Sequence, residues 1–316
     1  MNYNHDVSTA RILGPFILAL TCAPLLIGGA CEKKTSKASD PGIVEALDRT
    51  GSNGSAAVAT KVDTTPLQGI DIGKLDKDKQ QTFYKLLGTL KSPCGKTESL
   101  RKSYVDDTAC KRAPFAIRLV VAMLEDEFPE DKIREDYISK YEKAKKVKLD
   151  VSKAPRAGTD DAPVRIAEFF DYACPHCKEF KPTLDAVVQQ FEGKISVHYM
   201  MFPLGHWPNS KSAAQAAIAA SQQGKFKDMH ALLFAKSPAH TKEDVLGYAG
   251  QLGLDIAKFD AAYNAAAAQV ENDKAQGNAA DVDSTPSVYF NDRKFEGPIT
   301  VKYLGLWIDE ELAVNR

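Results

Sequence analysis

The stretch Val164–Cys177 reads VRIAEFFDYACPHC, and it joins a run of apolar residues almost directly to two cysteines separated by two residues. Val164–Phe170 is short and rich in apolar residues, which is typical of a buried strand. Apolar residues then recur at helical spacing up to Phe191, and Ile195–Phe202 predicts a further strand. Two strands joined by a helix form a βαβ unit with parallel pairing and a right-handed crossover. The stretch therefore predicts an α/β domain.

The two cysteines form a C-x-x-C motif after a strand and at the start of a helix, which is a redox motif in this context. Pro175 suits the first helical position, and Cys174 then lies where free backbone N–H groups stabilise a thiolate. The alternative is zinc, but a closed zinc site normally needs four ligands and no second pair with ligand spacing occurs nearby. We interpret His206, His230 and His240 as surface or packing residues.

The rest of the C-terminal half alternates strands and helices around this unit. Alternating apolar residues predict a half-buried strand just before it, followed by a loop, and an Ala-rich helical stretch after it. The chain then predicts a hairpin that turns at Asn291 and Asp292, and a final helix. These elements are expected over residues 147–151 (strand), 155–161 (loop), 210–278 (helices), 287–290 with 293–295 (hairpin) and 301–312 (helix).

Several stretches resemble DsbA-like thiol:disulfide oxidoreductases, and they occur in the order in which that family has them. They are the active-site stretch 167–177, Phe202–Leu204, Gln223–Phe226, Leu232–Phe234, Leu252–Asp255 and Ser284–Ser287. The resemblance covers about residues 155 to 312. It implies a thioredoxin-like fold with an inserted helical lobe over about residues 206–280, inside a domain that spans 146–316.

The resemblance also implies roles for individual residues. Cys174 would be the exposed nucleophile and Cys177 the buried resolving thiol of a redox-active disulfide that needs no other cofactor. Pro286 would be cis opposite the cysteines, leaving the backbone of Thr285 free to pair with a substrate strand. His176 would donate charge or a hydrogen bond to the Cys174 thiolate, unless it is only an exposed helix residue. Glu168 would be a buried acid that assists proton transfer to Cys177, unless it is an ordinary strand-edge carboxylate.

A small helical region over residues 67–145 precedes this domain. Apolar residues at helical spacing predict three helices, the second with Pro114 in its first turn and the third starting near Pro129. Cys94 and Cys110 flank the first connection and most simply form a structural disulfide, which for a loop of this length contributes about 3 kcal/mol. The alternative is a second redox pair that relays electrons to the main domain. Distant cysteines lack the helix-start placement that activates a thiolate, which favours the structural disulfide.

The N-terminus has the features of an export signal. Residues 1–30 contain Arg11 in a polar start, an apolar stretch and small residues before Cys31, which predicts a lipoprotein signal with lipidation of Cys31. An uncleaved single membrane span is the alternative. Residues 31–66 are rich in small and polar residues and predict a flexible tether. The remainder would then face an oxidising compartment, the periplasm.

The charge composition excludes one class of binding partner. Lys and Arg total 41 and Asp and Glu 42, so the net charge of −1 leaves no electrostatic footprint for nucleic acid. Two function classes remain. The first is a membrane-tethered enzyme that acts on cysteines of exported proteins as an oxidase, or as an isomerase or reductase, and is recycled by a membrane thiol oxidase or reductase. The second is a non-catalytic module that holds clients and uses its disulfides only for stability.

Overall fold

A mixed five-stranded sheet with strand order β1-β3-β2-β4-β5 forms the centre of the C-terminal half. The computed structural model describes residues 62–315. β2 and β3 pair in parallel, and the other neighbours pair antiparallel. The strands are β1 (Arg156–Gly158), β2 (Val164–Phe170), β3 (Ile195–Met201), β4 (Ser287–Phe290) and β5 (Arg293–Lys294). The predicted βαβ unit and hairpin are both present.

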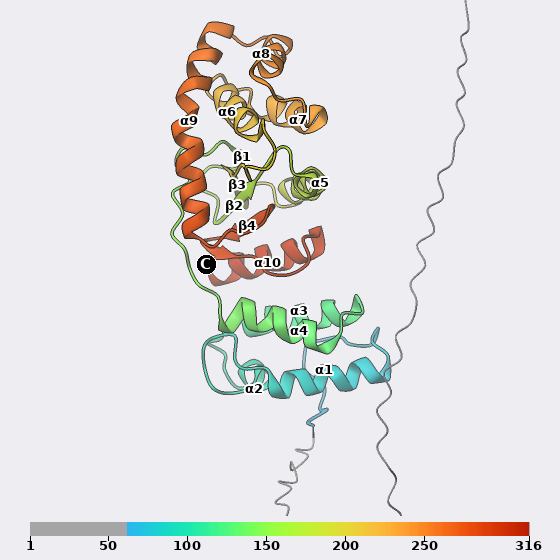
Figure 1. Cartoon of the computed structure of the whole chain (residues 1–316). Helices are drawn as coiled ribbons and strands as arrows, with labels where there is room; N and C mark the ends of the chain where they lie inside the picture. Colours follow the sequence, from blue (N-terminus) through green and yellow to red (C-terminus); the bar gives the residue numbers. More distant parts are fainter. Residues whose placement is uncertain (1–61, 316) are drawn as a thin grey trace, which may run out of the picture. The chain divides into compact units, whose positions relative to one another are not determined.

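The helices complete a thioredoxin-like fold with a helical insertion. α5 connects β2 to β3, the four helices of the insertion lie between β3 and β4, and α10 follows the hairpin. Figure 1 shows α6, α7 and α8 at the end of the sheet away from α10, whereas α9 runs alongside the sheet towards α10. Their bounds are α5 (Pro175–Gln190), α6 (Ser210–Ser221), α7 (Phe226–Lys236), α8 (Lys242–Gln251), α9 (Ile256–Ala279) and α10 (Val301–Val314). The predicted fold class is confirmed.

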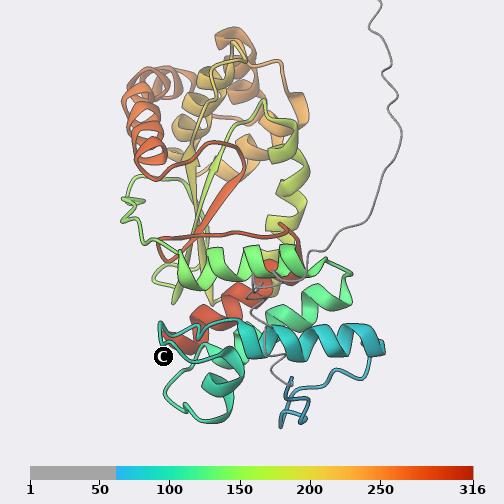
Figure 2. The same cartoon turned by 60° about the horizontal axis from the view of Figure 1, so that its bottom comes forward.

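The helical region before the sheet packs against α10. It consists of α1 (Lys77–Thr89), α2 (Leu100–Val105), α3 (Ala113–Glu125), α4 (Glu130–Tyr137) and a π-helical turn, η1 (Ile138–Glu142). α3 contacts α10, which in turn contacts β2, β4 and α5 (Figure 2). Cys94 and Cys110 are joined by a disulfide that spans the loop containing α2, a helix that the sequence did not predict. Residue Asp63, which we placed in the tether, pairs with Arg101 of α2 at 2.7 Å.

The strand expected over residues 147–151 is wrong, and so is the loop expected over 155–161. Residues 147–151 form no strand, although Leu149 and Val151 are buried and account for the alternating pattern. They pack with Phe169 and Met200 on one face of the sheet. The edge strand β1 lies instead within the expected loop. Alternation reports which side chains are buried, and here burial comes from packing on the sheet face rather than from pairing in it.

The end of β1 and the turn between β4 and β5 depend on backbone conformations that few residues adopt. Gly158 has φ +88°, and a Cβ at this position would lie 2.4 Å from the carbonyl oxygen of Ile195 in β3. Only glycine allows this close approach of β1 to β3. Asn291 and Asp292 have φ of 47° and 70°, the pattern of a two-residue hairpin turn with positive φ at both positions. This turn sets the register of β4 with β5.

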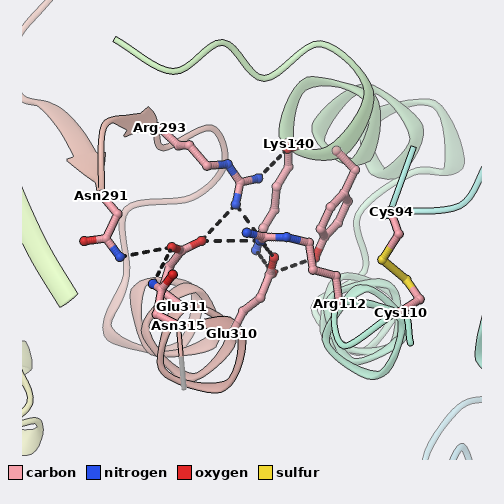
Figure 3. Close-up of polar contacts among 10 residues, drawn as sticks. Cys94, Cys110, Arg112, Lys140, Asn291, Arg293, Glu310, Glu311 and Asn315 are labelled. Atoms are coloured by element: carbon pink, nitrogen blue, oxygen red, sulfur yellow. Dashed lines mark hydrogen bonds and ion pairs between the residues drawn. A yellow bond between two sulfur atoms is a disulfide. The ribbon is translucent and has the colours of Figure 1, made fainter. Parts of the chain in front are cut away.

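A buried group of charged side chains joins the helical region to α10 (Figure 3). Glu310 is fully buried and interacts with Arg112, with Nζ of Lys140 at 2.7 Å and with the hydroxyl of Tyr141 at 2.8 Å. The neighbouring Glu311 accepts a hydrogen bond from Arg293 at 2.9 Å and one from Asn291 at 3.0 Å; it also pairs with Arg112 at 3.3 Å. Buried charges require such partners, because each unpaired charge loses its hydration without compensation. Two of the three cations come from the helical region.

Candidate active site

The two cysteines of the motif lie at the start of α5, as the sequence predicts. Cys174 is the N-cap residue with extended backbone, and Pro175 occupies the first helical turn. Both thiols are free in the structure. Cys177 is fully buried, which suits a resolving thiol. The expectation that Cys174 is exposed is wrong, since only 3% of its surface is accessible. The loop containing Thr285 covers its sulfur.

The loop before β4 brings a cis proline to the cysteines. The bond between Thr285 and Pro286 is cis, and the thiol of Cys174 donates to the carbonyl oxygen of Thr285 at 3.5 Å. The hydroxyl of Thr285 lies close enough to Cys177 to lower the pKa of that thiol slightly, although it makes no hydrogen bond of ordinary geometry. The structure thus brings four of the predicted site residues together at the end of the sheet.

Glu168 lies in β2 and is almost completely buried. Burial, and then the charge of Asp185, raise its pKa to about 8, so the carboxyl group holds its proton at neutral pH. The pKa of Cys177 is raised as well, first by burial and second by Glu168. The charge of Glu168 therefore makes Cys177 harder to ionise. This coupling is what a proton donor and acceptor pair in a dry site requires.

His176 does not approach the thiol in this structure. Its side chain is 74% exposed and lies 3.6 Å from the carboxylate of Glu179, one turn further along α5. An interaction between His176 and Cys174 stays a prediction. The other histidines agree with their interpretation as surface or packing residues: His230 and His240 are buried, and His206 is exposed beside Trp207.

Asp171 is a residue of this site to which we assigned no role from the sequence. It is 2% exposed, and its carbonyl oxygen accepts the N–H group of Cys174 at 3.1 Å. Its carboxylate accepts the N–H groups of Ala173 and Leu204, both at 2.9 Å. A charged residue between the apolar strand and the motif is the sequence signal that could have singled it out, although not its partners, since aspartate is rarely buried without a partner.

No group of three or more His, Cys, Asp or Glu side chains within residues 62–315 is arranged to hold a metal ion. The arrangement offers instead a dithiol whose first sulfur lies at a helix start and whose second is buried, with its pKa raised in part by a buried acid. A proline loop faces the first sulfur. Such a pair can alternate between dithiol and disulfide by attack of a thiolate on a disulfide sulfur.

The fold and this site define a thiol:disulfide oxidoreductase with a thioredoxin-like fold. The chain belongs to the thioredoxin family, whose model matches residues 150–310. It is similar to BdbD from Bacillus subtilis in its oxidised form, with 25% identity over 54% of this chain and 98% of that one, at a TM-score of 0.49. The thiol-disulfide exchange protein α-DsbA2 from Wolbachia pipientis is similar as well, with 22% identity over 57% and 94% of the two chains, at a TM-score of 0.46.

Part of the chain is also similar to proteins named for another activity. It is 31% identical to the Na(+)/H(+) antiporter NhaA 3 of Salinispora tropica over 164 residues, which is 50% of this chain and 25% of that protein. The chain therefore matches only about a quarter of the antiporter's length, and antiport is not carried over to it. No helix within residues 62–315 combines the length and the apolar character that a membrane crossing needs.

Proposed function

We propose that this protein is a disulfide donor, an oxidase that transfers the Cys174–Cys177 disulfide to cysteine pairs of exported proteins. The observation that carries the proposal is that the buried acid Glu168 raises the pKa of the buried thiol of Cys177. A resolving thiol whose pKa is raised needs a proton when it is released from the disulfide. A carboxyl group with a pKa of about 8 still carries that proton at neutral pH.

The reaction consists of two exchanges. A thiolate of the client attacks the sulfur of Cys174; the disulfide breaks, and Cys177 leaves as a thiolate that takes the proton of Glu168. The second client thiolate then attacks the client sulfur of the mixed disulfide, and Cys174 leaves as a thiolate. The client loses two electrons to the protein's cysteine pair. Thr285 and Pro286 would hold the client strand at Cys174. A membrane thiol oxidase would restore the disulfide.

The reduction potential of the full chain, measured against glutathione, tests the direction of transfer. An oxidase should lie close to the value of about −120 mV that DsbA has, whereas about −270 mV, the value of thioredoxin, would mark a reductase. A variant with both Cys94 and Cys110 changed to Ser should retain the same potential, because those cysteines have no part in the exchange.

Trapping of mixed disulfides tests the roles of the two cysteines. Cys177→Ala should accumulate clients bound through Cys174, because no resolving thiol remains to release them. Cys174→Ala should trap few clients, since Cys177 has no exposed surface and its raised pKa leaves little of the reactive thiolate. Equal trapping by both variants would contradict the assignment of Cys174 as the nucleophile.

Membrane attachment is part of the same proposal. Cys31, the signal over residues 1–30 and most of the tether over 31–66 lie outside the described residues. Their sequence supports export to the periplasm and anchoring through a lipid on Cys31. Cys31→Ser should release the protein from the membrane fraction or block its processing. Unchanged retention in the membrane would instead support an uncleaved N-terminal span.

A further inference from the structure

A row of four lysines follows the helical region and carries no compensating acids. Residues 142–150 read EKAKKVKLD, so no acid lies between Glu142 and Asp150, although the whole chain has a net charge of −1. All four lysines are exposed, and within residues 62–315 none of them forms an ion pair or donates a hydrogen bond. We call this set the lysine row: Lys143, Lys145, Lys146 and Lys148.

Backbone contacts with the hairpin of the sheet fix the segment that carries the row. The N–H group of Val147 donates to the carbonyl oxygen of Asp292 at 2.8 Å, and that of Leu149 donates to the Asp292 carboxylate at 3.2 Å. Val147 and Leu149 pack on the sheet and alternate with Lys146 and Lys148, which face solvent. A segment that is already ordered loses little conformational entropy when its lysines bind a partner together.

The lysine row lies at the opposite end of the sheet from the cysteines. β2 runs from Val164 to Phe170, and Cys174 follows its end. The hairpin turn lies beside the start of β2, where the N–H group of Asn291 donates to the carbonyl oxygen of Arg165 at 2.9 Å. A strand of this length extends over about 20 Å. A partner bound at the row therefore does not cover the active site.

The chemistry of the row favours a surface with many anions. An anionic lipid surface offers phosphate groups to several lysines at once, and each lysine close to such a surface contributes roughly fivefold to partitioning. A specific protein interface usually has an apolar centre. Residues 143–148 expose no large apolar side chain. The row therefore fits a lipid surface better than it fits a protein partner.

We propose that the lysine row binds the anionic surface of a membrane and turns the cysteines away from it, toward client proteins. This inference rests on the membrane attachment in the proposed function, and it adds an orientation to that attachment. Asp281 and Glu296 line a cavity of about 240 Å³ together with Lys143 and Lys145. These two acids weaken the attraction of the four lysines without cancelling it. Because the attraction is electrostatic, it should fall as the ionic strength rises.

Binding of the full chain to vesicles tests this surface. Vesicles of phosphatidylcholine with about one quarter phosphatidylglycerol are compared with vesicles of phosphatidylcholine alone, which measure any binding through the apolar N-terminus. Changing the four lysines of the row to Gln should weaken binding to the anionic vesicles at least about tenfold and leave binding to the neutral vesicles unchanged. Exchange with dithiothreitol should also stay unchanged, which shows that the variant is folded.

The matched control changes four exposed lysines of the helical insertion to Gln. It alters the net charge of the chain by the same amount, but at a different part of the surface, and should leave binding to the anionic vesicles nearly unchanged. These lysines are Lys211, Lys225, Lys242 and Lys258.

Acetylation of lysines with a water-soluble reagent, read out by mass spectrometry, tests the orientation on the wild-type chain. Anionic vesicles should protect the lysine row and leave Lys225 and Lys242 as reactive as they are in solution. High salt should remove the protection, because it screens the charges.

Three outcomes would overturn the inference. Equal weakening by the two sets of substitutions would mean that the net charge determines binding. Unprotected lysines in the row on vesicles that bind the protein would mean that another surface faces the lipid. Equal binding of the wild-type chain to anionic and neutral vesicles would exclude lipid as the partner and favour an acidic protein. Failure to exchange with dithiothreitol would instead contradict the proposed enzyme, and retention of Cys31→Ser in the membrane would contradict the lipid anchor.

Discussion

Replacing Glu310 by Gln removes the charge at the centre of the buried group that joins the helical region to α10 (Figure 3). The side chain keeps its shape, but Lys140, which is 2% exposed, loses the carboxylate that lies 2.7 Å from its Nζ. Burial already lowers the pKa of Lys140 to about 8, and Glu310 is the main influence that opposes this shift. Breaking a buried ion pair on one side typically costs about 3–5 kcal/mol, because the other charge stays buried and unpaired.

Thermal unfolding of the full chain measures this cost. For a protein of this size, each kcal/mol lowers Tm by about 2–4 °C, so Glu310→Gln should lower it by about 6–20 °C. The control is Glu271→Gln, which breaks the exposed pair with Lys211 at 2.6 Å and should cost less than about 1 kcal/mol.

A double-mutant cycle separates the pair from its surroundings. Lys140→Met combined with Glu310→Gln removes both charges and should recover much of the loss that either change causes alone. The reasoning is refuted if Glu310→Gln costs no more than Glu271→Gln. It is also refuted if the losses from Glu310→Gln and Lys140→Met simply add.

Three further predictions concern the active site and the stability of the surrounding fold. Glu168 has a pKa near 4.5 in the unfolded chain and about 8 in the folded protein. Between these pH values the folded state binds a proton that the unfolded state has lost. The free energy of unfolding therefore falls as the pH rises from 4.5 to 8, by roughly 5 kcal/mol. Urea unfolding at pH 5 and pH 8 should show this loss in the wild type and a smaller one in Glu168→Gln; equal losses would disprove it. Changing Cys94 and Cys110 to Ser should cost about 3 kcal/mol in the same assay, and no loss would mean that the bond does not constrain the loop. Gly158→Ala should destabilise the protein by more than about 1 kcal/mol, because its Cβ would clash with β3, whereas Gly193→Ala has open space and tests the cost of positive φ alone.

The chemistry of the site could be predicted from the sequence because it is local. Cys174, Pro175 and Cys177 are neighbours, and an apolar strand before them and a helical pattern after them determine how they are presented. The cis bond before Pro286 followed from the resemblance to DsbA-like proteins. Neither the covering of Cys174 by Thr285 nor the role of Asp171 could be derived in this way. Both depend on loops that come together only in the folded chain.

The burial of the charged residues of α10 could not be predicted from the sequence for a different reason. Residues 309–311 read Asp-Glu-Glu, a run that typically lies on a solvated helix face. Only Asp309 is exposed, whereas Glu310 and Glu311 are buried. Successive helix residues point in directions about 100° apart. Two adjacent buried carboxylates therefore require other parts of the chain to pack against two sides of the helix. The pattern of residues along α10 itself does not indicate this packing.

Different parts of the chain pack against the two sides of α10. Lys140 and Tyr141 reach Glu310 from the helical region, and Arg293 reaches Glu311 from the hairpin of the sheet. Arg112 contacts both carboxylates. The family match covers residues 150–310, so the matched part alone would retain Glu310 and Arg293 but neither of the cations that the helical region supplies, Arg112 and Lys140. The helical region thus contributes to the stability of the thioredoxin fold as well as lying between it and the N-terminus. α10 also contacts α5, the helix that starts at the two cysteines. Redox measurements should therefore be made on the full chain.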